Sequence, residues 1–445
     1  MDLKGLKQKD FIFFLACLCL AIGAQQMLET FYGGISLFIF LASFYMVFYL
    51  RFKKWSFSNH RIGLLLFICT WVFASTFILR SSLFFLFINT LLLPFFIVAQ
   101  LLLVTSKAKT VWFHWSFLLL FFRTIGAMFN YIKTMLFSFL SKFKRGVNER
   151  TIQVIKKIFI GLLISGPILF FVLILLTSAD LEFRRIVLLI PSELFQFQLG
   201  NGLIRFVIIS ILTFILFSFM QVLYYRAVPL EQKIQPQRSF SWDNIIIWTL
   251  LISLNLVYLL FTIIQFRYLF TDRLLNGFTY AEYARRGFFE LLIVTILNLS
   301  ILVIVVTFMK HQSIWSKQMN QVLLTLLVVF TKVMLISAFL RLMMYEDAYG
   351  YTFSRVLAHS FMLYLLLLLI YTFLKIWIDR LSIIHFYLLS GIIFYTGLNV
   401  INLEQLVVNE NLERYEKTGK VDIDYLNSMS YTGWSGLMDL YQKKS

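Results

Sequence analysis

Charged residues are scarce in this chain, at 14% of its 445 residues, whereas a soluble domain usually carries about 25%. Hydrophobic residues make up 60%. So few charges could not cover the surface of a water-soluble globule of this size, and lipid must therefore solvate much of the chain. The composition excludes an ordinary soluble protein and predicts an all-α fold, a polytopic transmembrane helical bundle.

Cysteine is also rare, and the sequence shows no catalytic motif. The three cysteines lie inside apolar stretches, so they predict neither a disulfide framework nor a metal site. No two histidines have the spacing of a zinc site, and the sequence has no phosphate-binding loop, nucleophile elbow or kinase signature. We therefore expect no cofactor and no bound metal, and we identify no catalytic residue.

Positive charge, in contrast, is plentiful, with a formal net charge of +18. The Lys and Arg residues lie in short clusters between apolar runs and form no soluble basic domain, which argues against nucleic-acid binding. Such clusters anchor membrane spans at anionic lipid headgroups. The expected partners are membrane lipids, including anionic lipids at the cytoplasmic face.

Long apolar runs are the dominant feature of the sequence. A run of about 17 to 25 residues crosses the hydrocarbon layer as a helix, because the backbone must satisfy its own hydrogen bonds there. About eleven spans are expected, at 11–28, 31–50, 62–79, 82–105, 158–178, 206–225, 245–265, 288–308, 320–340, 356–376 and 383–400.

The distribution of Lys and Arg predicts the orientation. With the N-terminus inside, the inner connections hold about 24 of these residues, against about 10 in the outer loops and about 5 in the tail. Cytoplasmic loops retain positive charge, so we expect a cytoplasmic N-terminus and an extracytoplasmic tail.

One basic connection, 106–157, makes that orientation ambiguous. The apolar run 111–122 is too short for an ordinary span, so we interpret it as interfacial or half-inserted. If it crossed with the residues after it, the tail would move inside. Apolar residues then recur at helical spacing, which indicates an in-plane amphipathic helix or, alternatively, a linker packed on the bundle. The cations expected to meet lipid headgroups are Lys133, Lys142, Lys144 and Arg145.

Five regions follow from this pattern. They are a four-span region at 1–105, the basic interfacial segment at 106–157, two spans with an apolar outer hairpin at 158–225, a five-span core at 245–400, and a soluble tail at 401–445. The loop 226–244 is the best candidate for a boundary between two helical halves. The tail predicts a short helix that ends at Gly419, followed by another from Asp424.

Three separated segments carry a family resemblance: TYAEYARRGFFELL from Thr279, RLMMYEDAYGYTFSRV from Arg341, and NLEQLVVNENLERYEKTGKVDIDYLNSMS from Asn402. Over roughly 245–430 they resemble bacterial membrane proteins of the domain-of-unknown-function 4173 type, and the related 4153 group. That resemblance implies a bacterial inner-membrane protein of the cell envelope and supplies no mechanism. It implies that the motif residues are Tyr283, Gly287, Tyr349, Gly350, Thr352, Asn411, Arg414, Asp422 and Tyr425.

All three segments are expected on one side of the membrane, where their charges would form a cap. In one interpretation, Arg and Glu side chains clamp the tail onto the bundle. In the other, the cap encloses a polar groove that binds an anionic ligand, since the planar fork of arginine suits phosphate or carboxylate. The groove residues would be Glu282, Arg285, Arg341 and Arg355.

Lys332 is the strongest single candidate for a functional residue inside the membrane, because it interrupts an apolar span. A charge inside the membrane indicates a functional site, with Glu290 as a candidate partner, although lysine also reaches toward the interface by extending its side chain. For His359 the simplest interpretation is a hydrogen bond between helices.

Two functions remain open. The first is a non-enzymatic transporter-like protein or an envelope scaffold or sensor, whose cap binds an anionic ligand or an envelope protein. The second is a membrane enzyme acting on a lipid-linked substrate. A continuous polar path would favour transport, and a filled bundle with a flat cap would favour a scaffold or sensor.

Overall fold

The computed structural model describes residues 8–29, 34–79, 82–106, 112–142, 161, 165, 198–225, 242–269, 287–309 and 313–444. The described chain is helical apart from turns, bends and one isolated bridge between Trp242 and Met309. It divides into two compact units, residues 1–79 with 89–232 and residues 80–88 with 233–445. The division falls inside the loop 226–244.

The first unit is built from long apolar helices. They are α1 (Gln8–Glu29), α2 (Gly34–Arg51), α3 (His60–Leu79), α4 (Leu83–Thr105), whose first residues cluster with the second unit, α5 (Trp115–Lys142) and α8 (Gln198–Tyr224). Helix α1 packs against α8 and α2. Aromatic rings fill these contacts, as where the Phe14 and Phe217 ring centres lie 5.3 Å apart, edge to face.

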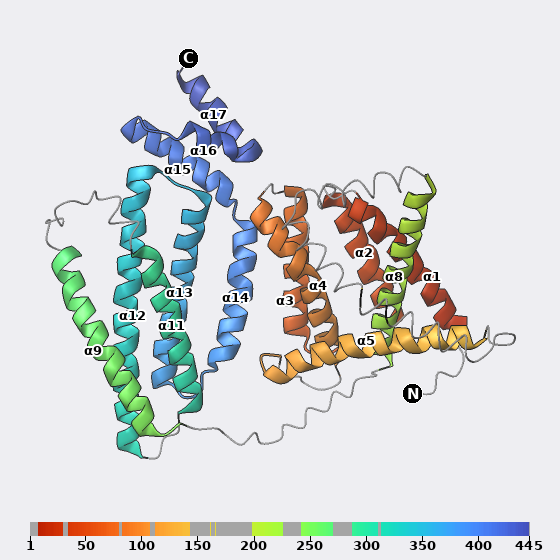
Figure 1. Ribbon diagram of the computed structural model, residues 1–445, viewed down its shortest axis with the longest axis horizontal. Helices are drawn as coiled ribbons and strands as arrows, with labels where there is room; N and C mark the ends of the chain where they lie inside the picture. The colour runs from red at the N-terminus through yellow and green to blue at the C-terminus, as the bar shows by residue number, and fades with distance from the viewer. Residues whose placement is uncertain are drawn as a thin grey trace. The chain divides into compact units, whose positions relative to one another are not determined.

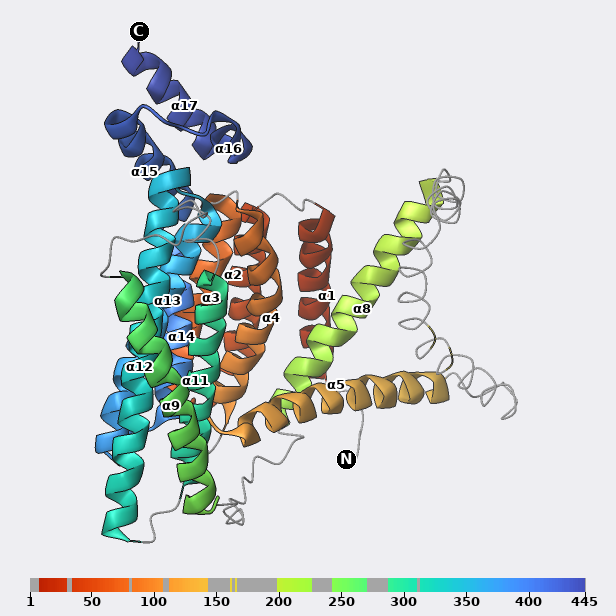
Figure 2. The ribbon, with the colours of Figure 1, turned by 60° about the vertical axis from the view of Figure 1, so that its left-hand side comes forward.

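Helix α5 runs crosswise to α3 and α4 in both Figure 1 and Figure 2. It joins the predicted interfacial run and most of the predicted amphipathic segment into one continuous helix of 28 residues. It packs against α8, and the Tyr131 ring lies 6.4 Å from that of Phe217.

The second unit contains a bundle of five helices and a group of three short ones. The bundle helices are α9 (Asn244–Leu269), α11 (Phe288–Phe308), α12 (Ile314–Tyr349), α13 (Phe353–Trp377) and α14 (Ile383–Val400). The short helices, called here the C-terminal module, are α15 (Leu403–Thr418), α16 (Ile423–Ser428) and α17 (Ser430–Lys444). Figure 1 shows the module at the end of the bundle where α12 gives way to α13.

Polar side chains join α12 to α9 and α11 along its length. Asn298 accepts from the Tyr258 hydroxyl at 2.7 Å and donates to Thr331 Oγ1 at 3.1 Å. Similar bonds link Trp248 to Asn320, Asn255 to the Leu323 carbonyl, and Ser337 to Gln265. Such bonds contribute about 1 kcal/mol or less each in a membrane, so together they fix helix register more than they add stability.

Among the described residues, eleven helices are long and apolar enough to cross a membrane. Ten of them coincide with predicted spans, and the helical bundle is thus confirmed. The predicted span 158–178 lies outside the described residues, apart from 161 and 165. The eleventh helix that meets the criterion is instead α5, within residues Trp115–Met135.

Helix α12 is longer than its predicted span. It has 36 residues, which at 1.5 Å per residue is about 54 Å, well beyond the ~30 Å of the hydrocarbon layer. Its last turns, from Arg341 to Tyr349, lie beyond the predicted span 320–340. The C-terminal module docks at this end of α12 (Figure 1).

Candidate functional site: the cap of the second unit

The cap is organised around the turn between α12 and α13. Gly350 there has φ +84°, a conformation that favours glycine. A Cβ at Gly350 would meet Asn411 Oδ1 at 2.8 Å and Arg414 Nη1 at 3.2 Å. The glycine therefore allows α15 to approach the turn closely.

Asn411 on α15 is bonded to Tyr351 in two directions. Its Nδ2 donates to the Tyr351 carbonyl at 2.8 Å, and the Tyr351 N–H donates to its Oδ1 at 3.0 Å. The side chain of Asn411 is buried. The side chain of Asn411 thus satisfies both backbone groups of Tyr351, as a neighbouring backbone segment would.

Arg414, one turn further along α15, satisfies the end of α12. Its Nη2 donates to the carbonyls of Ala348 at 2.9 Å and Asp347 at 3.2 Å, and its Nε donates to Asp347 at 3.2 Å. The last carbonyls of a helix lack partners within the helix and carry partial negative charge, so a cation stabilises them.

Tyr425 on α16 satisfies the beginning of α13. The side chain of Thr352, at the N-cap, makes no capping hydrogen bond. The Phe353 N–H donates instead to the Tyr425 hydroxyl oxygen at 2.7 Å. Burial raises the pKa of the Tyr425 phenol above its ordinary value, so the hydroxyl stays protonated near neutral pH.

The local structure of the module places these groups. Gly419 ends α15 in a left-handed conformation, as predicted, and Asp422 begins α16 by accepting from the Tyr425 N–H at 2.9 Å. All four tail motif residues, Asn411, Arg414, Asp422 and Tyr425, therefore bind the turn or cap a helix, and Gly419 directs the chain between them.

The candidate arginines are engaged with the chain itself. Arg355 Nη1 donates to the Gly350 carbonyl, and its guanidinium carbon lies 4.2 Å from the Tyr345 ring centre. Arg341 is buried, and its Nη1 occupies the place that a Cβ of Gly287, at φ +88°, would take. The structure thus brings Arg341 and Gly287 together. Glu282, Tyr283 and Arg285 lie outside the described residues.

A buried acid and base lie just below the turn. Glu346 Oε2 and His359 Nε2 are 2.8 Å apart, with side-chain exposures of 4% and 16%. His359 does make the bond between helices that the sequence suggests, but Glu346 was not identified as its partner. The pairing follows from the hairpin at Gly350, which returns α13 beside the end of α12, and the residue types alone do not reveal it.

Lys332 is half-buried on α12, with its ammonium 5.4 Å from the Phe373 ring centre. Glu290 is exposed in the first turn of α11, and within the described ranges no ion pair joins it to Lys332. The cation rests on an aromatic face, an arrangement that stabilises a lysine without a carboxylate.

The first unit holds a buried ion pair that sequence reasoning missed. Arg51 Nη2 donates to Asp10 Oδ1 at 2.6 Å and to Gln221 Oε1 at 3.1 Å. The guanidinium also lies 4.2 Å from the Tyr224 ring centre. The pair ties the ends of α1, α2 and α8 together, and these residues are far apart in sequence, so no local pattern links them.

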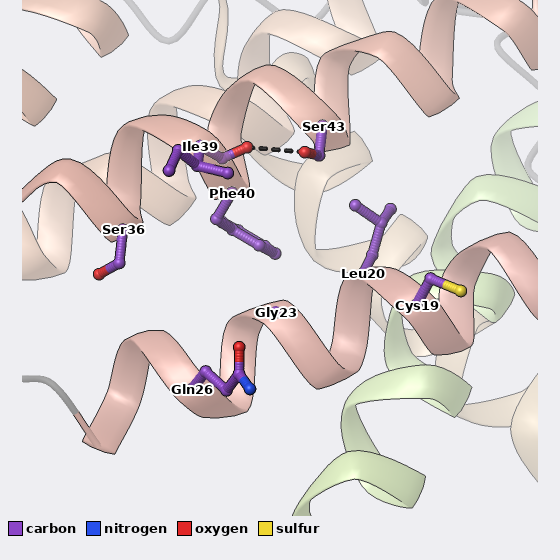
Figure 3. Close-up of a pocket in the computed structure, with 8 residues that line it drawn as sticks. All are labelled: Cys19, Leu20, Gly23, Gln26, Ser36, Ile39, Phe40 and Ser43. Atoms are coloured by element: carbon purple, nitrogen blue, oxygen red, sulfur yellow. Dashed lines mark hydrogen bonds between the residues drawn. The ribbon is translucent and has the colours of Figure 1, made fainter.

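Two cavities also lie in the first unit. One, of about 460 Å³, separates α1 from α2; Figure 3 shows Phe40 between the two helices, with Ser43 donating to the Ile39 carbonyl at 2.8 Å. The other, of about 260 Å³, shares Phe40 and is lined mainly by apolar residues of α1 to α4. Neither brings charged groups together.

The remaining predicted residues are peripheral. Lys133 is exposed on α5, Lys142 is the last residue of that helix, and Lys144 and Arg145 lie outside the described residues. Tyr349 is exposed at the end of α12. No group of three or more His, Cys, Asp or Glu side chains in the described chain could hold a metal ion.

Comparison with known families identifies the family of this chain. The family described as domain of unknown function (DUF4153) matches residues 67–440. This chain belongs to that family. The match begins far upstream of the predicted 245–430 and includes most of the first unit, whereas the finer resemblance to the 4173 type is not part of it. Comparisons with curated proteins and with solved structures find no match.

Proposed function

We propose that this DUF4153 protein is a non-enzymatic membrane scaffold or sensor that presents its C-terminal module to a protein partner. The observation that carries the proposal is the use made of Asn411, Arg414 and Tyr425. All three satisfy main-chain groups of the α12–α13 turn. Groups used in this way hold the module against the turn.

Helix α17 supplies the surface that a partner would meet. Gly433 and Gly436 lie so close to α16 and α15 that a Cβ would collide with the Leu426 carbonyl and the Val408 side chain. The opposite stripe carries large exposed side chains at intervals of three or four residues, namely Tyr431, Trp434, Met438 and Tyr441, exposed by 81, 56, 51 and 78%. Exposed aromatic stripes at this spacing are typical of helix-in-groove recognition.

An anionic ligand held by the arginines is the weaker version of this proposal. Arg355 and Arg414 direct donors at carbonyl oxygens, and Arg355 also stacks on a tyrosine ring. An anion would have to displace these bonds. The arrangement supports the clamp interpretation over the groove, and over an enzyme acting on a lipid-linked substrate.

For location, we propose a bacterial inner membrane with the N-terminus in the cytoplasm and the module on the outer side. The excess of Lys and Arg in the expected inner connections supports this orientation. The crosswise direction of α5 supports it too, because a helix lying in the interface does not change the number of crossings.

Site-specific photocrosslinking in intact membranes tests the proposal. A photoreactive residue at Tyr441 should give a discrete adduct with a protein partner, and the same residue at the exposed Asn409 of α15 should not. Adding Trp434→Ala should remove the Tyr441 adduct while membrane abundance is unchanged. Equal adducts from both positions, or none from Tyr441, would contradict the proposal.

A further inference from the structure

The Glu346–His359 pair carries two polar atoms that the docking of the module does not use. Within the described part of the chain, Glu346 Oε1 and His359 Nδ1 are buried and have no hydrogen-bond partner. Glu346 is only 3% exposed. Buried polar atoms are usually satisfied, so two orphans in one acid–base pair require a specific explanation.

The pair is joined to the turn through its own backbone. The Glu346 carbonyl accepts from the Gly350 N–H at 2.7 Å, which ends α12 at the glycine that α15 approaches. His359 is held from the other side by Phe339, with ring centres 4.4 Å apart. A change in the charge of the pair therefore acts on the turn to which the module is bonded.

Charged or titratable groups lie on the helices that pack against α12 and α13 at this end of the unit. They are Arg341, Tyr345 and Asp347 on α12, Arg355 on α13, Tyr351 in the turn, Glu290 in the first turn of α11, and Glu410 and Arg414 on α15. Of the arginines, Arg355 and Arg414 donate to carbonyls, as described above. Histidine is the side-chain type that ordinarily changes charge near neutral pH, and His359 is the histidine of this pair.

We propose that Glu346 and His359 form a buried proton-binding site whose occupancy controls the docking of the C-terminal module. One proton from water adds to the imidazole, no covalent bond of the chain breaks, and an imidazolium faces a carboxylate. Without that proton the carboxylate remains as a buried negative charge beside a neutral ring, which is costly in a poorly solvated site.

The direction of the effect follows. Proton uptake neutralises the pair and stabilises the turn, so docking tightens as the pH falls and loosens as the pH rises. The inference rests on the proposed function for its meaning, since it identifies a proton as the signal that a sensor would receive. Its test needs no partner.

Hydrogen–deuterium exchange of the purified full-length protein provides that test. Protection of residues 403–428, corrected for the intrinsic pH dependence of exchange, should fall about tenfold between about pH 6 and about pH 8.5. His359→Gln replaces the imidazole by an amide, which still donates a hydrogen bond but does not take up a proton. This variant should flatten the dependence of protection on pH. Glu346→Gln removes the buried charge and should flatten it as well.

Tyr425→Phe is the matched control. It removes the hydroxyl that accepts from Phe353, so it should lower protection at every pH and leave the slope unchanged. A flat profile in the unmodified protein, or an unchanged slope in His359→Gln that still folds, would overturn the inference. If His359→Gln fails to fold, the pH profiles of the unmodified protein and of Glu346→Gln still test the inference. Loss of the Tyr441 crosslink with a normal pH profile would instead count against the proposed function alone.

Discussion

A single asparagine closes the α12–α13 turn on both its donor and its acceptor side. Alanine at Asn411 would leave the N–H and carbonyl of Tyr351 without these partners. Because each lost bond to a partly buried group costs about 1 kcal/mol, Asn411→Ala should weaken docking by about 2 kcal/mol.

Exchange protection of residues 403–418 measures this loss, which corresponds to a decrease of roughly thirtyfold. Asn409→Ala is the control, since Asn409 is exposed on the same helix and, within the described chain, its side chain bonds to Gln405 alone. Equal decreases in the two variants would contradict the role of Asn411 as the clamp.

The buried pair in the first unit permits a second test at the residue scale. Asp10→Asn leaves Arg51, whose side chain is 13% exposed, charged and without its carboxylate, and breaking a buried pair costs about 3 to 5 kcal/mol. Thermal unfolding in detergent should register a clear loss of stability. The double variant Asp10→Asn with Arg51→Met should regain much of it, because both charges are then gone; no recovery would show that the pair is not the cause.

At the scale of elements, Gly433 and Gly436 allow α17 to pack closely against α16 and α15. The Cβ of alanine at Gly433 would collide with the Leu426 carbonyl, a backbone atom that moves only with α16. Gly433→Ala should therefore separate α17 from α16 at a cost of about 1 to 3 kcal/mol. Limited proteolysis should cut α17 faster in this variant than in Ser435→Ala, and equal rates would contradict the packing.

Elements were predictable wherever hydrocarbon dictates length. Ten spans follow from apolar runs, because a backbone in lipid has few alternatives to a helix. Helix α5 is the instructive exception, since it meets the same criteria of length and composition while lying across its neighbours. Hydropathy reports that a segment contacts lipid and does not report its direction.

For the candidate site, the sequence patterns predict a shared cap and do not predict the bonds within it. The motif segments place Gly350, Asn411, Arg414 and Tyr425 in one cap, and the structure joins them there. The partners could not be read from sequence, because Arg414 and Tyr425 bind main-chain groups, which every residue carries. For the same reason an arginine that caps a helix and one that binds an anion look alike in sequence.

At the scale of the whole molecule, the orientation is open to a direct test. In a variant without its native cysteines, Asn409→Cys should react in intact cells with a membrane-impermeant maleimide, and Lys53→Cys should not. Both positions are exposed, so accessibility does not distinguish them. Labelling of both from the same side would mean that the number of crossings between them is even, which would exclude α5 as a purely interfacial helix or add another crossing.

The turn at Gly350 also bears on how the protein is made. Ribosomes synthesise α12 and α13 before α15 and α16. Three main-chain groups of the turn are therefore unpaired until Arg414 and Tyr425 have been synthesised: the carbonyls of Asp347 and Ala348 and the N–H of Phe353. A polypeptide released before Arg414 would contain every described bundle helix of the second unit and still display these unpaired groups. Membrane proteases that recognise exposed polar backbone would thereby distinguish truncated chains from finished ones.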